Sequence, residues 1–460
     1  MKVPLVPLVV LLLLAAASVS LGGLEGVGVL ALGGAFLVAF SLLLFRRATA
    51  DLAGTRNRRA EDDTNFIWTV ILTGTAIRVA LAVAMRLTGI NTSVAPDEST
   101  FHDNALWFSA WMRGDVGQPF SYKWNGSAQV GYFALAGALY GTFGEFPFVP
   151  VLLNCVVGGL CAYPAYLLAA RVSGRRAGRG AALLVTFFPS LVLWSALLIR
   201  DALVLFLLLW AACLAQSLLQ RFRIRTILWL AICLAALATL RSYLLMLVVA
   251  ATCISLLVAA VRKPGRALVT AAVCGGVVLA MMKFGDFGGD FFSDSALHNL
   301  AQRRQFNAIG GEGSIALEGY DLSTPTGALT YLPIGLCWFL LSPFPWQYSG
   351  RQGLAIPEVL IWYACIPLVV SGAAFALRRR RKLALVPLTA GILVTLLYSL
   401  VEGNVGIIFR HRAQALALLL PFAAIGWARR KTNERARLRE TMAAAQRSAT
   451  PVRRPVAVTT

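Results

Sequence analysis

The sequence has little charge and few of the side chains that carry out chemistry in water-soluble enzymes. Only 14% of its 460 residues are charged, 58% are hydrophobic, and the mean hydropathy is +0.71. Soluble domains have about 25% charged residues, so a soluble enzyme, a disordered chain and a small disulfide scaffold are excluded. The sequence has only three histidines and no HExxH pattern, which excludes zinc proteases of that type. It also has no GxSxG and no Walker pattern, which excludes rhomboid-like proteases and P-loop ATPases. A multi-span helical membrane protein remains.

Apolar segments of about 20 residues, the length that crosses a bilayer, are numerous. They predict twelve spans, at 3–20, 26–45, 65–87, 147–170, 181–199, 202–220, 226–240, 243–261, 267–284, 354–377, 383–401 and 413–428. The first resembles a signal peptide, but a second span follows almost at once, which favours an uncleaved anchor. The predicted fold class is therefore an all-α polytopic membrane protein.

The net charge of +21 is distributed in a pattern that predicts the orientation. Basic residues occupy every second loop, which places these loops and both termini in the cytoplasm. The basic clusters lie at 46–59, 171–179, 221–225, 262–266, 378–382 and 429–431. Because the runs are short and separated by spans, no nucleic-acid partner is expected. The basic tail 429–460 is expected to be frayed or disordered.

The spans and loops predict five parts of the chain. These are a span pair with a basic loop at 1–64, a transmembrane module at 65–284, an outer loop at 285–353, further spans at 354–428 and the tail 429–460. A first outer loop, 88–127, lies within the module. Ten of the 21 acidic residues fall in the two outer loops, where chemistry is expected. Residues 128–144 are predicted to form a helix on or dipping into the outer leaflet, because counting them as a span would place 171–179 outside.

The first candidate site is the acidic pair Asp97-Glu98, which follows a span directly. One carboxylate can act as a general base on an acceptor hydroxyl while the other orients the acceptor or a cation. The alternative is a solvated acidic loop that caps a helix beginning near Asp103.

Arg200-Asp201 lies between two spans with almost no loop, so the pair is predicted at the outer membrane edge. Charges at this depth are costly and often functional. Asp201 is a candidate second catalytic carboxylate, and Arg200 is a candidate phosphate ligand. The alternative is a salt bridge in which Asp201 caps the next helix.

Further cations lie at the outer ends of spans, where the positive-inside trend does not explain them. The candidate phosphate ligands among them and their neighbours are Arg241, Tyr243, Arg410, His411 and Arg412. A guanidinium can bind phosphate with two parallel hydrogen bonds, so the phosphate of a lipid carrier is the expected ligand. The alternatives are ordinary anionic headgroups or pairing with Glu402.

Two further features are candidates. Arg78 lies within a span and needs a buried partner, either a carbonyl or Asp201. In the second outer loop, His298 and Arg303 are candidate substrate ligands, and the Trp-rich segment 331–346 is a candidate wall for a lipid-linked substrate or an aromatic belt.

Together these residues resemble the C superfamily of integral-membrane glycosyltransferases (GT-C). The resemblance rests on Arg78, on the stretch PDESTFH at 96–102, on the surface helix, on a basic GRRAGRG turn, and on FFPS at 187–190 before Arg200-Asp201. It covers about 65–220, and Asn404–Arg412 loosely. Within it the sequence is similar to the protein O-mannosyltransferase and aminoarabinose-transferase group and to the oligosaccharyltransferase catalytic subunit. The sequence departs from the family in lacking the Lys-Pro-Pro run and the WWD-type motif, and in its extra span pair at 3–45.

The resemblance implies a GT-C-like fold of about twelve transmembrane helices with two long outer loops carrying interfacial helices. It implies sugar transfer from a polyprenyl-phosphate-linked donor to a glycan or protein acceptor, with Asp97 as base, Glu98 in support, Asp201 as second carboxylate and Arg410 or Arg412 holding the phosphate. A bacterial cytoplasmic membrane is expected, with the site on its extracytoplasmic face. No cofactor is required, although Asp97, Glu98 and Asp201 leave a divalent cation open.

Two other functions fit the same sequence. One is a polysaccharide polymerase or ligase that uses a diphosphate-linked glycan, with its site around His298, Arg303 and Arg304. The other is a flippase or transporter for a lipid-linked sugar, which would require charged residues along a central cavity.

Overall fold

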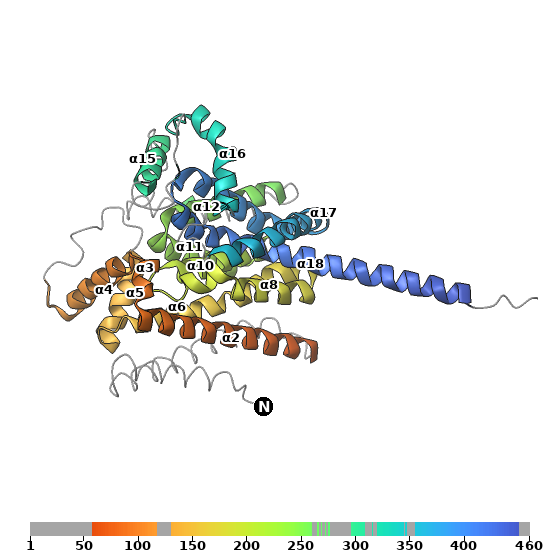
Figure 1. The fold of residues 1–460 in the computed structure, drawn as a ribbon, viewed down its shortest axis with the longest axis horizontal. Coiled ribbons are helices and arrows are strands. Elements are labelled where there is room, and N and C mark those ends of the chain that lie inside the picture. The colour runs from red at the N-terminus through yellow and green to blue at the C-terminus, as the bar shows by residue number, and fades with distance from the viewer. Residues whose placement is uncertain are drawn as a thin grey trace, which may run out of the picture.

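The computed structural model is a bundle of helices without a β-strand in the part that it describes (Figure 1). It describes residues 58–116, 130–259, 296–308, 320–344 and 355–449, together with single residues at 265, 268, 272, 275, 276, 315 and 346. The helices are α2 (Arg58–Thr88), α3 (Ile90–Val94), α4 (Glu98–Arg113), α5 (Val130–Phe143), α6 (Phe148–Leu160), α7 (Ala162–Ser173), α8 (Arg175–Phe187), α9 (Pro189–Trp194), α10 (Asp201–Gln220), α11 (Ile224–Leu240), α12 (Ser242–Ala259), α15 (Ala296–Ala308), α16 (Pro325–Leu341), α17 (Ile356–Val401) and α18 (Val405–Ala449).

Five stretches of helix are long and apolar enough to cross a membrane, so the protein is a multi-pass membrane protein. They are Asp62–Thr88, Phe148–Ser173, Asp201–Gln220, Ile356–Val401 and Val405–Glu434. α5, α11, α12 and α16 are shorter apolar helices. The count of twelve spans is not confirmed, because 3–20 and 26–45, and most of 267–284, lie outside the described residues.

α17 is a hairpin of two helices rather than one straight rod. Its 46 residues would extend about 70 Å if straight. Both of its ends nevertheless reach the start of α18, because Glu358 lies 3.9 Å from Arg412 and Tyr398 bonds to Gln414 at 2.5 Å. The chain must therefore turn back, and the non-helical backbone of Arg380 marks the turn. This agrees with the separate spans predicted at 354–377 and 383–401.

The span predicted at 181–199 is wrong as a single helix. α8 ends at Phe187, α9 covers only Pro189–Trp194, and 195–200 is not helical. Pro189 has no amide hydrogen to donate and disfavours helical backbone in the residue before it, and Phe188 is accordingly extended with ψ 128°. The irregular segment 195–200 precedes Asp201 directly, and its apolar residues are buried.

The first outer loop contains more structure than the sequence indicated. α3 and α4 lie in it, and α4 begins at Glu98 rather than near Asp103. α5, predicted as a surface helix at 128–144, is about 21 Å long, shorter than the roughly 30 Å hydrocarbon core. It packs on α4, where a Cβ on Gly137 would overlap Phe108 and the carbonyl of Ala105.

The expectation of a frayed tail is wrong as far as Ala449. α18 continues without interruption from the last span to this residue and projects from the bundle (Figure 1). The tail is rich in Ala, Arg and Glu, which have high helix propensity. Arg430 and Glu434, one turn apart, lie 3.5 Å from each other.

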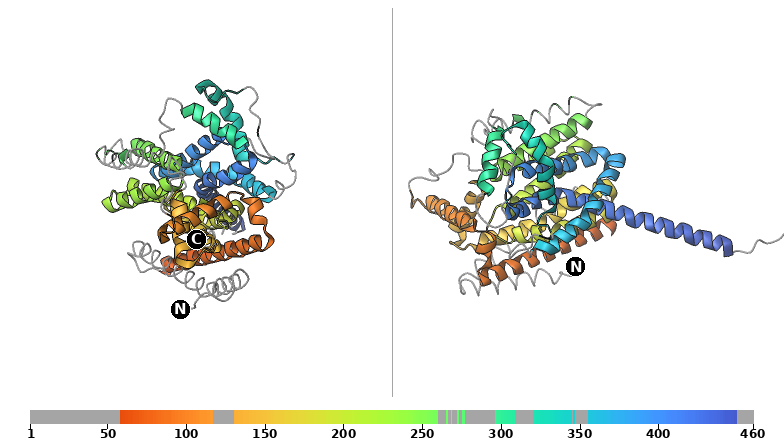
Figure 2. Two further views of the ribbon diagram at one scale, coloured as in Figure 1. Left: turned by 90° about the vertical axis from the view of Figure 1, so that its left-hand side faces the viewer. Right: turned by 45° about the horizontal axis from the view of Figure 1, so that its top comes forward.

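The described basic loops gather at one end of the bundle. α8 is tied to α2 there, since Arg179 bonds to Asp62 at 2.6 Å and to Asp63 at 2.8 Å. This end of the bundle contains the basic segments 171–179, 221–225, 378–382 and 429–431 (Figure 1). The opposite end contains α3, α4 and α5. Figure 2 shows α15 and α16 on the side of the bundle opposite α2.

Candidate functional site

An acid–arginine cluster lies at the end of the bundle away from the basic loops. It is formed where four connections meet: the residue before α4, the start of α10, the link between α11 and α12, and the first turns of α18. We use this name for Asp97, Asp201, Arg241 and Arg410. Arg410 is 313 positions from Asp97 and 209 from Asp201 along the chain.

Asp201 is the buried centre of the cluster, with 2% of its surface exposed. Arg241 donates to its Oδ1 at 3.1 Å. Arg410 donates to its Oδ2 through Nε at 2.9 Å and through Nη2 at 2.5 Å. A carboxylate in an apolar bundle requires such partners, and two guanidinium groups supply them. The predicted capping role is wrong, because Asp201 is the first residue of α10 and no side chain caps this helix.

Arg410 joins this buried carboxylate to an accessible one. Its Nη1 donates to Oδ2 of Asp97 at 2.7 Å. The side chain of Asp97 is 40% exposed, whereas those of Arg410 and Asp201 are 16% and 3% exposed. Trp194 lies beside the guanidinium, with its ring centre 5.6 Å from Cζ. A phosphate that reaches Asp97 would therefore meet a cation already oriented by a buried acid.

A second layer of polar side chains orients Arg241. Its Nη1 donates to the hydroxyl of Tyr243, to that of Tyr398 at 3.3 Å and to Nε2 of His411 at 2.8 Å. Because a guanidinium only donates, Nε2 of His411 must be an acceptor. The proton of this imidazole is then on Nδ1, which donates to Glu402 at 2.7 Å.

The resulting chain of hydrogen bonds runs from Glu402 through His411 and Arg241 to Asp201, and then through Arg410 to Asp97. His411 is therefore a positioning group for Arg241 and not a cation of the cluster. Its predicted pairing with Glu402 is confirmed.

Tyr398 is a member of this layer that the sequence did not indicate. It stacks on His411 with ring centres 4.7 Å apart, bonds to Gln414 at 2.5 Å and lies 3.0 Å from the hydroxyl of Tyr243. It occurs in an apolar span with no charge or motif beside it, so no local signal could have selected it.

Glu98 does not join Asp97. It is 5% exposed and accepts hydrogen bonds from Asn91 at 2.6 Å and from the backbone amide of Leu198. Asp97 lies just before α4 and Glu98 is its first residue, so successive side chains turn by about 100° and diverge. Glu98 therefore does not contact Asp97 but holds the backbone at Leu198, which precedes Asp201.

Three side chains hold the irregular segment 195–200: Glu98 and Asn154 bond to its backbone, and Arg78 bonds to the hydroxyl of Ser195. Besides Glu98, Asn154 donates to the carbonyls of Leu197 at 2.7 Å and Ile199 at 2.8 Å. Arg78 donates to Ser195 at 2.7 Å and to the carbonyl of Gly74 at 2.9 Å. Of the two partners predicted for Arg78, the carbonyl is confirmed, and Asp201 is wrong.

Arg200 has unused hydrogen-bonding capacity at the edge of the cluster. Its Nε and Nη1 atoms are buried and have no hydrogen-bond partner in the described part of the protein. Its Cζ lies 6.0 Å from the ring centre of Phe101. A half-buried cation whose donors Nε and Nη1 are unfilled, next to Asp201, suits an anion better than it suits a closed structural pair.

Arg412 does not face the cluster. It is fully buried, donates to the carbonyl of Ser342 and lies 3.9 Å from Glu358. It thus links α18 to the end of α16 and the start of α17. Since it is two positions beyond Arg410, it projects from another side of the same helix. Its expected role as a ligand of the carrier phosphate is not supported by this position.

The second outer loop reaches the site through Arg304. This residue is fully buried and donates to Tyr331 at 2.5 Å, to the carbonyl of Glu402 and to that of Leu400 at 3.4 Å. His298 pairs with Gln302 on the same helix at 3.0 Å, and no hydrogen bond joins it to the cluster in the described structure. Arg303 is an exposed residue of α15.

The described residues do not assemble a metal site of three or more His, Cys, Asp or Glu side chains. Between Asp97 and Asp201, where the sequence left a divalent cation open, the guanidinium of Arg410 bonds to both carboxylates. Asp97 and Asp201 are thus both paired with an arginine, and Glu98 bonds to Asn91 instead.

Comparison with known proteins identifies the fold. No family model matches the sequence, and no curated protein matches it. The solved structure of the archaeal oligosaccharyltransferase AglB from Archaeoglobus fulgidus, in complex with an inhibitory peptide and a dolichol-phosphate, is similar with a TM-score of 0.50 and 15% identity. The match covers 85% of this chain and 52% of that one, so this chain spans about half of its length. The GT-C-like fold is thereby supported, without preference for one group within it.

Proposed function

We propose that the protein is a membrane glycosyltransferase that transfers a sugar from a polyprenyl-phosphate-linked donor to an acceptor. The observation that carries the proposal is Arg410, which joins the accessible carboxylate of Asp97 to the buried carboxylate of Asp201 at one end of a GT-C-like bundle. The dolichol-phosphate in the AglB complex supports a donor of the same class.

In the proposed reaction Asp97 accepts the proton of the acceptor hydroxyl or amide. The acceptor atom attacks the anomeric carbon, the bond from this carbon to the phosphate oxygen breaks, and the lipid phosphate leaves with the electron pair. This single displacement inverts the configuration. Arg410 and Arg200 neutralise the charge that develops on the phosphate, which is the largest barrier to such a step.

Asp201 and Arg241 have a different role in this scheme. They are buried behind Arg410 and hold its guanidinium in a fixed direction, so that no reorganisation accompanies the reaction. His411, Tyr243 and Tyr398 in turn hold Arg241. In this scheme Asp97, Arg410 and Arg200 are the residues that touch the substrate.

The extracytoplasmic face of a bacterial cytoplasmic membrane is the location that this proposal requires. The acid–arginine cluster lies at one end of the bundle, and the described basic loops lie at the other. Because basic loops remain in the cytoplasm, this asymmetry supports an outer site that acts on a cell-envelope glycan or a protein.

The two alternatives receive less support. A polymerase or ligase site around α15 would need Arg304, which is occupied by backbone carbonyls and Tyr331. A transporter would need charge along its path, and the mid-span Arg78 is instead tied to Ser195 and Gly74.

The test is mass spectrometry of the lipids that co-purify with the wild type, with Asp97→Asn and with Asp103→Asn. Asp103 is an exposed carboxylate of the same helix and serves as the matched control. We expect a polyprenyl-phosphate sugar to accumulate in Asp97→Asn, because binding remains while proton transfer is lost, and to be depleted in the other two. A diphosphate-linked glycan would favour the polymerase or ligase. Bulk phospholipid alone in all three proteins would contradict the transferase.

A further inference from the structure

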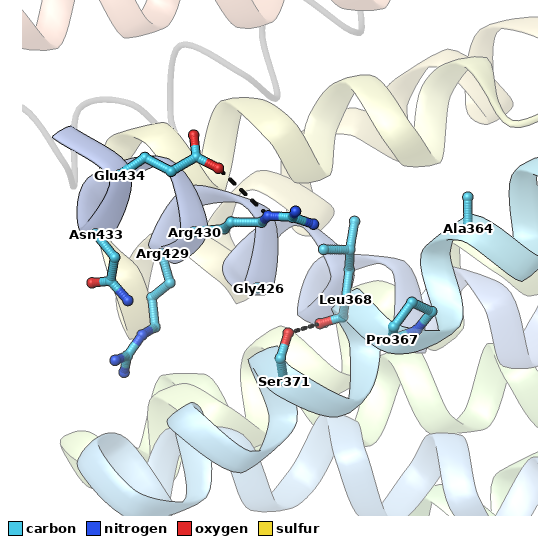
Figure 3. A pocket seen from close by; sticks show the side chains of 9 residues that line it. All are labelled: Ala364, Pro367, Leu368, Ser371, Gly426, Arg429, Arg430, Asn433 and Glu434. Atoms are coloured by element: carbon cyan, nitrogen blue, oxygen red, sulfur yellow. Dashed lines mark hydrogen bonds and ion pairs between the residues drawn. The ribbon is translucent and has the colours of Figure 1, made fainter. Parts of the chain in front are cut away.

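A cavity lies between α17 and α18, far from the acid–arginine cluster. Its volume is about 620 Å³, within the range of roughly 300–1,000 Å³ typical of small-molecule sites. Figure 3 shows its lining: Ala364, Pro367, Leu368, Ser371, Gly426, Arg429, Arg430, Asn433 and Glu434.

The cavity is a consequence of how the two helices cross. At Gly372 and Gly426 the backbones are so close that a Cβ would overlap the carbonyls of Phe422 and Leu368. On one side of this crossing, residues 364–371 of α17 and 426–434 of α18 form the two walls of a wedge.

The wedge lies at the membrane face opposite the acid–arginine cluster. Arg429 is 19 positions beyond Arg410 on the same helix, a rise of about 28 Å, which nearly equals the roughly 30 Å thickness of the hydrocarbon core. Arg429 and Arg430 are thus at the level of the headgroups, and the α17 wall faces the acyl chains.

The two walls differ in chemistry. α17 contributes the apolar side chains of Ala364, Pro367 and Leu368, together with Ser371, whose hydroxyl donates to the carbonyl of Leu368 at 3.0 Å. α18 contributes Arg429, Arg430 and Asn433, with Glu434 3.5 Å from Arg430. The formal charge of this wall is positive, with two arginines against one glutamate.

Arg429 is held in place within this arrangement. Its Cζ lies 4.1 Å from the ring centre of Phe375 on α17, so the guanidinium lies over this ring in a cation–π contact between the two helices. A cation fixed at a headgroup level beside an apolar wall has the lining that an amphipathic anion requires.

We propose that this wedge is a binding site for one anionic phospholipid, with its phosphate diester at Arg429 and Asn433, which are one turn apart on α18, with Arg430 adding positive charge beside them, and with an acyl chain along Ala364, Pro367 and Leu368. The net positive wall selects phosphatidylglycerol over a zwitterionic lipid, because the latter would bring an ammonium group beside two arginines. The proposal is independent of the glycosyl-transfer reaction.

Native mass spectrometry of the full chain, equilibrated with equal amounts of phosphatidylglycerol and phosphatidylcholine, tests it. We expect one retained phosphatidylglycerol in the wild type and about tenfold less in Arg429→Ala/Arg430→Ala. Ala364→Trp fills the wedge without changing charge and should lose the lipid as well. The control, Arg378→Ala/Arg379→Ala, removes the same charge from exposed positions at the same end of the bundle and should retain it.

Three results would overturn the site. Equal retention of the two lipids by the wild type would contradict selectivity for phosphatidylglycerol. Equal loss of the lipid in Arg378→Ala/Arg379→Ala would show that the loss results from general surface charge and not from this site. Retention by Ala364→Trp would place the lipid elsewhere. Monodisperse elution of each variant confirms that the fold is intact before the lipids are compared.

Discussion

The two carboxylates that share Arg410 should differ in how much the same substitution lowers the stability of the protein. In Asp201→Asn the buried charge that Arg241 and Arg410 both use is removed, while the guanidinium groups remain. Removing one partner of a buried pair costs about 3–5 kcal/mol, because the remaining charge is left without compensation. Asp97 is 40% exposed and makes one ion pair. Its loss should cost less than about 1 kcal/mol.

The burial of each group decides these magnitudes. Asp201 is 3% exposed at its side chain and Arg241 is 2% exposed, so water cannot replace the lost contacts. At Asp97 water can solvate both the new amide and the Nη1 atom of Arg410. We therefore expect Asp97→Asn to abolish sugar transfer with the stability of the wild type, and Asp201→Asn to lower both.

The assay is an SDS titration of the purified full chain, followed by circular dichroism, which gives the denaturant midpoint of each variant. Asp103→Asn, at an exposed position of α4, is the control for a neutral carboxamide in place of a carboxylate. A midpoint for Asp201→Asn equal to that of the wild type would refute the reasoning. So would an equal decrease for Asp97→Asn, since Asp97 would then be a structural anchor.

Other substitutions test separate contacts. Glu98→Ala should lower the free energy of unfolding by about 2–3 kcal/mol, since the Leu198 amide and Asn91 lose a charged acceptor; the same SDS midpoint measures it, and no change would contradict the anchoring role. Gly372→Ala should lower the free energy of unfolding by about 1–3 kcal/mol through overlap with the α18 backbone, whereas an unchanged SDS midpoint would contradict the tight crossing. Arg304→Ala should destabilise the protein while the neighbouring Arg303→Ala should not reduce sugar transfer; loss of transfer in Arg303→Ala with normal stability would favour the polymerase or ligase.

Several properties of the protein followed from local sequence. The excess of apolar residues required membrane spans, and the basic loops marked one end of the bundle. Asp97, Asp201, Arg241 and Arg410 could be selected as candidates because a charge at the end of an apolar span is costly and stands out. Pro189 is equally local, and its lack of an amide hydrogen is sufficient to break the helix within 181–199.

Other features depended on which helix faces pack together. Consecutive residues of a helix turn by about 100°, so Glu98 and Asp97 face different surroundings, as do Arg410 and Arg412. Arg410 and its two carboxylates are separated by more than 200 positions, and no local pattern encodes that meeting. Tyr398 is part of the site only because the hairpin of α17 returns it to His411.

The features that local sequence determines and those that helix packing determines differ for one physical reason. Transfer of a side chain between water and lipid depends on the residue and its neighbours in the chain, so the sequence alone determined the membrane class, the candidate charges and the basic end. The partner of each buried charge depends on the packing of all the helices at once. Only the tertiary structure therefore decided that Arg410 connects Asp97 with Asp201, that Glu98 and Arg412 turn away, and that α17 and α18 leave a wedge beyond their crossing.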